Sequence, residues 1–220
     1  MTTPQDSSIR PELRPRTLIA AYASGAFPMP DPEDGSRMLW FSPDPRGLLP
    51  LDERFHVPRR LQRTIRQGRF VLTIDRAFEA VMRGCAQRKE GTWITRDFIE
   101  AYGRLHQLGL AHSVEAWEPD AVGTPAPPAG GVYGVALGGA FFAESMFHRR
   151  TDAGKVALVG LIQHLRRRGF VLCDVQWLTR HLHQFGAYAV PRAEYLSLLS
   201  QALAARVHFT EQPPPAGHQG

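Results

Sequence analysis

Cysteine and long apolar runs are scarce in this chain of 220 residues. Its two cysteines, Cys85 and Cys173, show no metal-binding spacing, which argues against a disulfide framework or zinc ribbon and predicts free, buried thiols. Prolines break the uncharged stretch 121–143, and the roughly 15 residues after the last proline are too few to cross a bilayer. The opening residues, MTTPQDSSIRPELRPR, lack the apolar segment of a secretory signal, so we expect a cytoplasmic protein without a membrane span.

Lysine is also scarce, because Lys89 and Lys155 are the only lysines in a chain of net charge +5. Arginine suits bidentate contacts with phosphate, but a GC-rich genome produces the same excess of arginine without any function. The distribution of charge is more informative than its total. Residues 54–69 contain no acid and six arginines, which predicts a localised basic face: Arg54, Arg59, Arg60, Arg63, Arg66 and Arg69.

The composition, with 43% hydrophobic and 21% charged residues, is that of a globular protein and excludes disorder and collagen-like structure. A helix over residues 17–24 ends at Gly25, and a proline-rich stretch follows. We therefore expect a small N-terminal subdomain over residues 1–52, with about the first ten flexible, a main domain over 53–209 and a flexible tail over 210–220.

Helix and strand signals become regular after residue 57. Pro58 and Gly68 bound a helix, and Asp75 and Thr95 are the expected caps of the next two. Further helices are expected over 151–168, 178–185 and 192–204, and strands over 70–74, 113–117, 131–137, 140–144 and 170–175. This order resembles the acyltransferase fold of the GNAT superfamily: an α+β class with a mixed central sheet flanked by helices.

An acetyl-CoA enzyme of this topology would carry a glycine-rich turn before the helix at 151–168, where backbone N–H groups hold the pyrophosphate. The sequence there reads MFHRRTDAGKVAL (residues 146–158) and lacks that turn. The absence argues against a CoA donor.

Five segments together resemble the leucyl/phenylalanyl-tRNA–protein transferase family and span roughly residues 18–203: AYASGAFP (21–28), WFSPDPRG (40–47), EGTWITRDFIEAYGRLHQLGLAHSVEAW (90–117), GGVYGVALGGAFFAESMF (130–147) and CDVQ (173–176). The resemblance implies transfer of leucine or phenylalanine, with methionine as a third candidate, from aminoacyl-tRNA to the N-terminal amine of proteins. It also implies acceptors beginning with Arg or Lys, a role in N-end rule degradation, and no cofactor or metal.

The resemblance implies four catalytic residues: Asp174, Gln176, Glu144 and Tyr22. Asp174 and Gln176 are expected on one face at the end of a strand, where Asp174 would orient Gln176 and the incoming amine. Glu144 would hold an amino group, and the Tyr22 hydroxyl would bond to the donor or to the strand-end carboxylate. Without the resemblance, Asp174 reads as a carboxylate bonded to the next turn, and Glu144 as a solvated edge residue.

Aromatic and apolar residues are expected to form the donor pocket. The resemblance places Trp93 and Tyr102 around the terminal adenosine, although the helical spacing of Tyr102 also fits core packing. Met29 stands where the family usually has an aromatic residue. The expected cup for the donor side chain consists of Val132, Ala143, Ser145, Met146 and Phe147, closed by Phe27 and Phe41.

Two basic groups are candidates for tRNA phosphate binding: Arg59, Arg60, Arg63 and Arg66 on one helix, and Arg149, Arg150 and Lys155 near the start of another. The nine histidines show no metal spacing and are expected at the surface. A monomer is expected. Three alternatives stay open at this point: a GNAT-like N-acyltransferase with another donor, the same chemistry with N-terminal Asp or Glu acceptors, and an RNA-binding module with an inactive site.

Overall fold

A computed structural model describes residues 10–31, 33–34, 37–87 and 92–211 of the chain. Residues 1–9 and 212–220, which belong to the predicted flexible ends, lie outside the described residues. No helix in the described part is both long and apolar enough to cross a membrane. Cys85 and Cys173 are free and buried, which confirms the expectation for both thiols.

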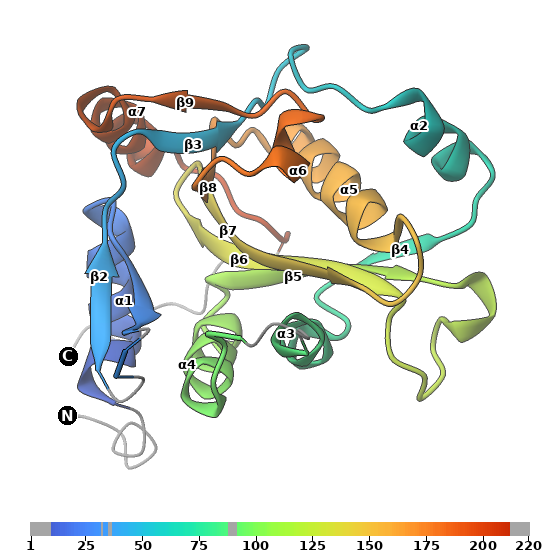
Figure 1. Cartoon of the computed structure of the whole chain (residues 1–220), viewed down its shortest axis with the longest axis horizontal. Helices are drawn as coiled ribbons and strands as arrows, with labels where there is room; N and C mark the ends of the chain where they lie inside the picture. Colours follow the sequence, from blue (N-terminus) through green and yellow to red (C-terminus); the bar gives the residue numbers. More distant parts are fainter. Residues whose placement is uncertain (1–9, 32, 35–36, 88–91, 212–220) are drawn as a thin grey trace.

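A seven-stranded sheet forms the centre of the molecule (Figure 1). Its neighbouring strands are antiparallel except for β7 and β8, which are parallel, so the sheet is mixed. In spatial order the strands are β4 (Val71–Ile74), β5 (Ala111–Trp117), β6 (Gly130–Leu137), β7 (Ala140–His148), β8 (Leu172–Gln176), β3 (Arg46–Leu49) and β9 (Tyr188–Val190). The predicted α+β class with a mixed, helix-flanked sheet is confirmed.

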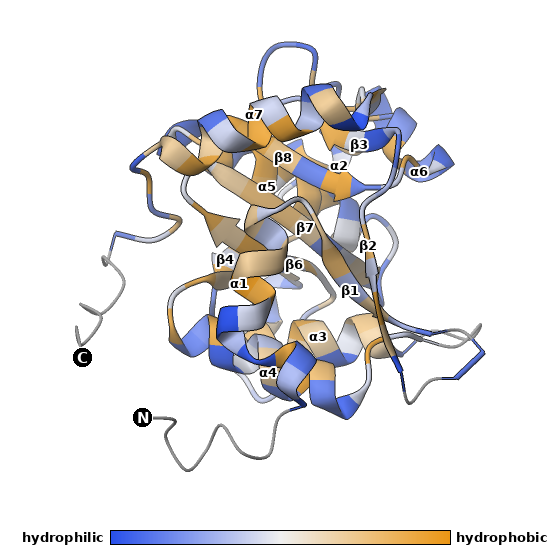
Figure 2. Cartoon of the chain, turned by 90° about the vertical axis from the view of Figure 1, so that its left-hand side faces the viewer, coloured by the Kyte–Doolittle hydropathy of each residue, from blue (hydrophilic) through white to orange (hydrophobic). Residues whose placement is uncertain are grey.

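Helices cover both faces of this sheet (Figure 1). On one face lie α3 (Phe78–Ala86) and α4 (Arg96–Gln107), and on the other lies α5 (Ala153–Arg168), which packs against β5, β6 and β7. Apolar residues therefore form one buried cluster on each side of the sheet, while polar residues occupy the outer faces of the helices (Figure 2). The remaining elements of this part are α2 (Arg59–Arg66), η3 (Pro119–Ala121), α6 (Arg180–His183) and α7 (Arg192–Ala204).

The N-terminal part lies beside the sheet and consists of η2 (Pro11–Leu13), α1 (Pro15–Ala23) and a two-stranded sheet of β1 (Phe27–Pro30) and β2 (Met38–Phe41). Sequence analysis predicts no strand in this proline-rich stretch, because prolines suggest a loop although their fixed φ is compatible with edge strands. The stretch also contains β3, which joins the large sheet between β8 and β9. The division of the chain at residue 52 stays a prediction.

Several predicted boundaries differ from the structure. Asp75 is not a helix cap, because α3 begins at Phe78 and the Asp75 carboxylate instead accepts a hydrogen bond from the Ser113 backbone N–H at 2.8 Å. The helix expected over 178–185 is reduced to the short α6, and the strand β9 that follows it was not predicted. Thr95 precedes α4 as expected, but its side chain makes no capping bond.

Candidate active site

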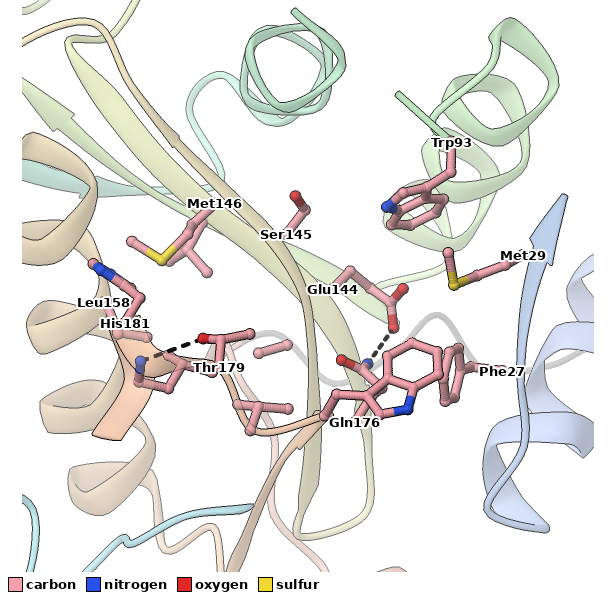
Figure 3. A pocket seen from close by; sticks show the side chains of 15 residues that line it. Phe27, Met29, Trp93, Glu144, Ser145, Met146, Leu158, Gln176, Thr179 and His181 are labelled. Carbon is pink, nitrogen blue, oxygen red and sulfur yellow. Dashed lines mark hydrogen bonds between the residues drawn. The ribbon is translucent and has the colours of Figure 1, made fainter. Parts of the chain in front are cut away.

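A cavity of about 510 Å³ opens where the two parallel strands separate. β7 and β8 pair only from Ala140 opposite Leu172 to Phe142 opposite Asp174, and both strands continue beyond that point without pairing to each other. Their unpaired ends supply much of the cavity wall (Figure 3). The lining residues are Phe27, Met29, Trp93, Val132, Ala143, Glu144, Ser145, Met146, Leu158, Val175, Gln176, Trp177, Thr179, His181 and Leu182.

β7 and β8 each carry a β-bulge at the cavity. On β6, Tyr133 pairs with Ser145 and Gly134 with Ala143, so Glu144 is the extra residue of β7. On β3, Gly47 pairs with Gln176 and Leu48 with Asp174, so Val175 is the extra residue of β8. A bulge bends its strand and redirects side chains, and here two bulges direct Glu144 and Gln176 toward each other.

The Glu144 carboxylate is the polar centre of the cavity (Figure 3). Its Oε1 accepts hydrogen bonds from the Tyr22 hydroxyl at 2.7 Å and from Gln176 Nε2 at 3.1 Å. The pKa of Glu144 is raised to about 8, chiefly by burial and also by the nearby Asp174 charge, although the hydrogen bond from Tyr22 and the charge of Arg46 lower it. Glu144 therefore exchanges a proton near the pKa of an N-terminal amine, which is about 7.7 to 8.

Two tyrosines lie beneath Glu144. The Tyr22 hydroxyl contacts that of Tyr102, and both rings are fully buried. Burial, with the Glu144 charge next, raises the pKa of each hydroxyl well above the usual value for tyrosine, so both remain protonated donors. Tyr22 therefore bonds to Glu144, within β7, and not to the strand-end carboxylate of Asp174 that was one of its two expected partners.

Asp174 lies behind the cavity wall and is completely buried. Its carboxylate accepts hydrogen bonds from Arg46 Nε and Nη2 at 2.9 and 2.7 Å, from the Tyr195 hydroxyl at 2.6 Å, and from the Gln176 backbone N–H at 2.8 Å. The expected direct contact of Asp174 with an incoming amine is therefore not available. The bulge at Val175 separates the two side chains, so that Gln176 lines the cavity while Asp174 does not.

Most of the expected donor-pocket residues line the cavity: Phe27, Met29, Trp93, Val132, Ala143, Ser145 and Met146. Phe147 does not, because its ring lies on the other face of the sheet and packs against α3 at Gly84. Tyr102 is stacked on Phe98 in the core, and Phe41 packs against Phe27 and Trp177 outside the lining. The expectation that Phe147, Tyr102 and Phe41 form the pocket wall is corrected accordingly.

The cavity has two chemically different ends (Figure 3). Near Glu144, its wall contains the rings of Phe27 and Trp93, with the Met29 thioether beside them. The Trp177 ring also lines the cavity and packs edge-on against Phe27. At the opposite end, the apolar side chains of Met146, Leu158 and Leu182 lie beside two polar ones, His181 and Thr179. The cavity thus offers flat aromatic surface at one end, a mainly aliphatic cup with the His181 imidazole in its wall at the other, and a carboxyl–amide pair between them.

Several site residues were missed by sequence analysis. Arg46 belongs to a quoted motif, but nothing in the sequence indicates that its partner is Asp174, 128 positions away. Leu158 lies on the apolar face of α5, where it reads as an ordinary core residue. For Trp177, Thr179 and His181 the only available signal was their position directly after the CDVQ segment.

The two basic groups differ in how their charges are used. Arg59, Arg60, Arg63 and Arg66 are exposed on α2, and none of the ion pairs found in the described residues involves them. In the second group, Arg149 donates to the Pro128 carbonyl at 3.0 Å, Arg150 pairs with Glu118 and Lys155 pairs with Asp152. The α2 arginines are therefore the more available partners for an external phosphate.

One group among the described residues could bring metal ligands together, namely Asp75, His106 and His112. Internal hydrogen bonds account for their positions: His112 lies 2.7 Å from Asp75 and 3.0 Å from the Gly109 carbonyl, and His106 lies 2.8 Å from the Ala111 carbonyl. His112 is buried, so the expectation that all histidines lie at the surface is wrong.

The sequence matches two family models along most of its length. Residues 48–200 match the leucyl/phenylalanyl-tRNA protein transferase model, and residues 11–44 match the model of its N-terminal domain. The chain belongs to the leucyl/phenylalanyl-tRNA–protein transferase family. It is accordingly an aminoacyltransferase, with aminoacyl-tRNA as donor and a protein as acceptor.

Relatives carrying this name cover nearly the same length. The leucyl/phenylalanyl-tRNA–protein transferase of Akkermansia muciniphila is 50% identical over 87% of this chain and 96% of its own. That of Herpetosiphon aurantiacus is 51% identical over 90% of this chain and 98% of its own. Among solved structures, L-PGS from Bacillus licheniformis aligns with a TM-score of 0.46 and 10% identity over 74% of this chain and 66% of that chain.

Proposed function

We propose that the cavity between β7 and β8 binds the aminoacyl-adenosine end of a charged tRNA and catalyses aminolysis of its ester. The observation that carries this proposal is the pairing of Glu144 with Gln176 inside a cavity with one aromatic and one aliphatic end. The adenine ring stacks on the aromatic end, since such stacking contributes about 1–3 kcal/mol per base. The donor side chain occupies the aliphatic cup.

The reaction needs positioning and one proton acceptor. The acceptor α-amine attacks the ester carbonyl carbon, a C–N bond forms, and the bond from that carbon to the ribose oxygen breaks. Glu144 takes the proton that the amine loses and returns it to the leaving ribose oxygen, a role that fits its pKa of about 8. Gln176 holds the Glu144 carboxylate and the reacting groups, and Tyr22 holds Glu144 from below.

The proposed donors are leucine and phenylalanine, with methionine as a third. The cup residues Val132, Met146, Leu158 and Leu182 offer dispersion contacts but little geometric discrimination. Because one methylene group changes binding by only about 1–3 kcal/mol, related apolar donors compete for such a cup. The proposed acceptors are proteins beginning with Arg or Lys, and the product is marked for N-end rule degradation.

The exposed α2 arginines bind the tRNA backbone in this proposal, with Arg149, Arg150 and Lys155 as a weaker second anchor. α2 packs against α5, and α5 carries Leu158 in the cavity wall, so the phosphate-binding helix is joined to the donor site through one helix. One chain contains the whole cavity, which fits a monomer. The enzyme would work in the cytoplasm, where charged tRNA is made and used.

Transfer of labelled leucine from Leu-tRNA to peptides beginning with Arg, Lys, Asp, Glu or Met tests this function, with leucyl-CoA as the control donor. We expect labelling of the Arg and Lys peptides from Leu-tRNA alone. Labelling of only the acidic peptides would overturn the proposed acceptor rule and retain the chemistry. Labelling from leucyl-CoA, or none from Leu-, Phe- or Met-tRNA, would overturn the proposed function.

The role of α2 is tested by changing Arg59, Arg63 and Arg66 to Gln. Each lost phosphate contact should reduce the slope of log binding constant against log salt concentration by about 1. The control is Arg83→Gln, because Arg83 lies on α3, across the sheet from α5, and is already paired with Glu79 at 2.5 Å. Equal salt dependence in the α2 variant and the control would exclude α2 from the tRNA interface.

A further inference from the structure

Arg46 lies behind the cavity wall and contacts residues on two sides of the cavity. Its side chain is completely buried. Its Nε and Nη2 donate to the Asp174 carboxylate, and its Nη1 donates to the Gly25 carbonyl at 2.9 Å. The guanidinium carbon lies 4.5 Å from the centre of the Tyr195 ring and 5.0 Å from that of Phe27. One side chain thus joins β3, β8, α7 and the turn between α1 and β1.

The first series of contacts runs from Arg46 through Asp174 to Gln176. Gln176 has φ +59°, a left-handed conformation that residues other than glycine rarely adopt. The Asp174 carboxylate accepts the Gln176 backbone N–H at 2.8 Å, and the Gln176 side chain then reaches Glu144 at 3.1 Å. Arg46 donates to both Asp174 oxygens and so holds this buried carboxylate in one orientation.

The second series of contacts runs from Arg46 through the Gly25 turn to Phe27. Gly25 has φ +81°, and a Cβ there would lie 2.8 Å from Leu196 Cδ2 and 3.0 Å from Tyr195 Cε1, so the turn lies directly against α7. Arg46 holds this turn through the Gly25 carbonyl. Phe27 follows two residues later and lines the cavity. The position of the aromatic wall therefore depends on the same guanidinium as the position of Gln176.

We infer that Arg46 is a positioning residue for aminoacyl transfer: through Asp174 and Gly25 it holds Gln176 and Phe27 in place on two sides of the cavity. Lysine cannot replace it, because an ammonium group lacks the planar fork that reaches both Asp174 oxygens and the Gly25 carbonyl together. The inference rests on the proposed function, since it assigns Arg46 a part in that same reaction.

Arg46→Lys tests this role because it preserves the buried charge. We expect kcat to fall by about 100-fold, since a small displacement of reacting groups has an effect of that size. The KM for aminoacyl-tRNA should rise far less than kcat falls, because a displaced Phe27 weakens only the contact with the adenine and the phosphate contacts on α2 lie elsewhere. The control is Arg168→Lys, whose arginine also holds backbone carbonyls, those of His208 and Thr210, but lies outside the cavity. It should leave kcat unchanged.

A double-mutant cycle separates positioning from a general loss of structure. If Arg46 acts largely through Gln176, Arg46→Lys should lower kcat far less in the Gln176→Ala background than in the wild-type background. If Arg46→Lys does not fold, Tyr195→Phe replaces it in the same cycle. This milder change removes only one hydrogen bond to Asp174. We expect a smaller loss with the same non-additivity.

Unchanged kcat in Arg46→Lys would overturn the inference, and so would equal fold-losses of kcat in both backgrounds. If Arg46→Lys does not fold, additive losses for Tyr195→Phe and Gln176→Ala would overturn it as well. A wild-type enzyme that transfers no amino acid from any charged tRNA instead overturns the proposed function, so the two failures are distinguishable.

Discussion

Two glutamates, Glu144 on β7 and Glu115 on β5, are held in similar ways and serve different purposes. Burial raises the pKa of both carboxyls, and each accepts hydrogen bonds from protein hydroxyl groups. Glu115 is enclosed: Ser113 and Thr73 donate to it at 2.5 Å, and the residue is completely buried. Glu144 faces a cavity and a neighbouring amide. A buried carboxyl with a raised pKa therefore marks a site only where a substrate can reach it.

The proposed difference between Glu144 and Glu115 is tested most strongly by Glu144→Gln. This change removes the proposed proton acceptor and retains the size of the side chain, so transfer should slow by about 100- to 10,000-fold. Affinity for charged tRNA should remain close to that of the wild type. Single-turnover transfer and filter binding measure the two quantities. A variant that transfers at the wild-type rate would remove the distinction between the two glutamates.

Filling the cavity should make Glu144 more like the enclosed Glu115. Val132 lines the cup and is almost completely buried, and Val132→Phe adds bulk there. We expect kcat/KM for Phe-tRNA to fall about 10- to 100-fold more than that for Leu-tRNA, since the larger donor needs the lost space. Competition between the two charged tRNAs measures this ratio, and an unchanged ratio would place the donor side chain elsewhere.

Glu115→Ala should affect stability and leave catalysis unchanged. The substitution leaves the hydroxyls of Ser113 and Thr73 without their buried acceptor, which lowers the free energy of unfolding by about 1–3 kcal/mol. Urea denaturation measures the loss, and kcat at a temperature where the variant is folded should match the wild type within about twofold. A large loss of kcat with intact folding would contradict the structural role.

The pH dependence of kcat tests whether Glu144 is the group that accepts the proton. With the Glu144 pKa at about 8, the ionised acceptor increases as pH rises through 8, and kcat should rise with it. The hydrogen bond from Tyr22 lowers this pKa, so Tyr22→Phe should move the midpoint to higher pH. A midpoint that moves down, or stays in place, would show that another group controls the profile.

The same pKa also predicts a change in stability. A folded-state pKa raised above the unfolded value favours folding below about pH 4.5, and this contribution is lost as pH rises through 8. Glu144→Gln does not titrate and should gain thermal stability relative to the wild type above pH 8. Melting temperatures at pH 5 and pH 9 measure this difference.

The sequence predicts the regular parts of the fold because hydrophobic periodicity is a local signal. The strands β5 and β6 and the helices α5 and α7 are found within about two residues of their expected bounds. The β1–β2 pair was missed because its prolines resemble those of a loop. The contact between Arg46 and Asp174 could not be predicted, because a pairing over 128 positions depends on the tertiary fold and leaves no local pattern.

The candidate site, like the fold, was predicted only in part from the sequence. Resemblance to a family brought Glu144, Gln176 and Tyr22 to attention, and the structure brings these side chains together. The error at Phe147 has a physical origin, because the adjacent residues Met146 and Phe147 point to opposite faces of the sheet. Which of Met146 and Phe147 faces the cavity depends on the bulge, since the single extra residue at Glu144 inverts the alternation of side chains along β7.

The bulge at Glu144 also makes the length of β7 a constraint on function. Before the bulge, Phe142 belongs to the cluster beneath α3 and α4, and after it Phe147 belongs to that cluster while Met146 faces α5. Deleting one residue here would exchange these two faces and point the Phe147 ring into the donor cavity. Natural variants of this enzyme should therefore tolerate substitutions along β7 far more readily than a change of one residue in its length.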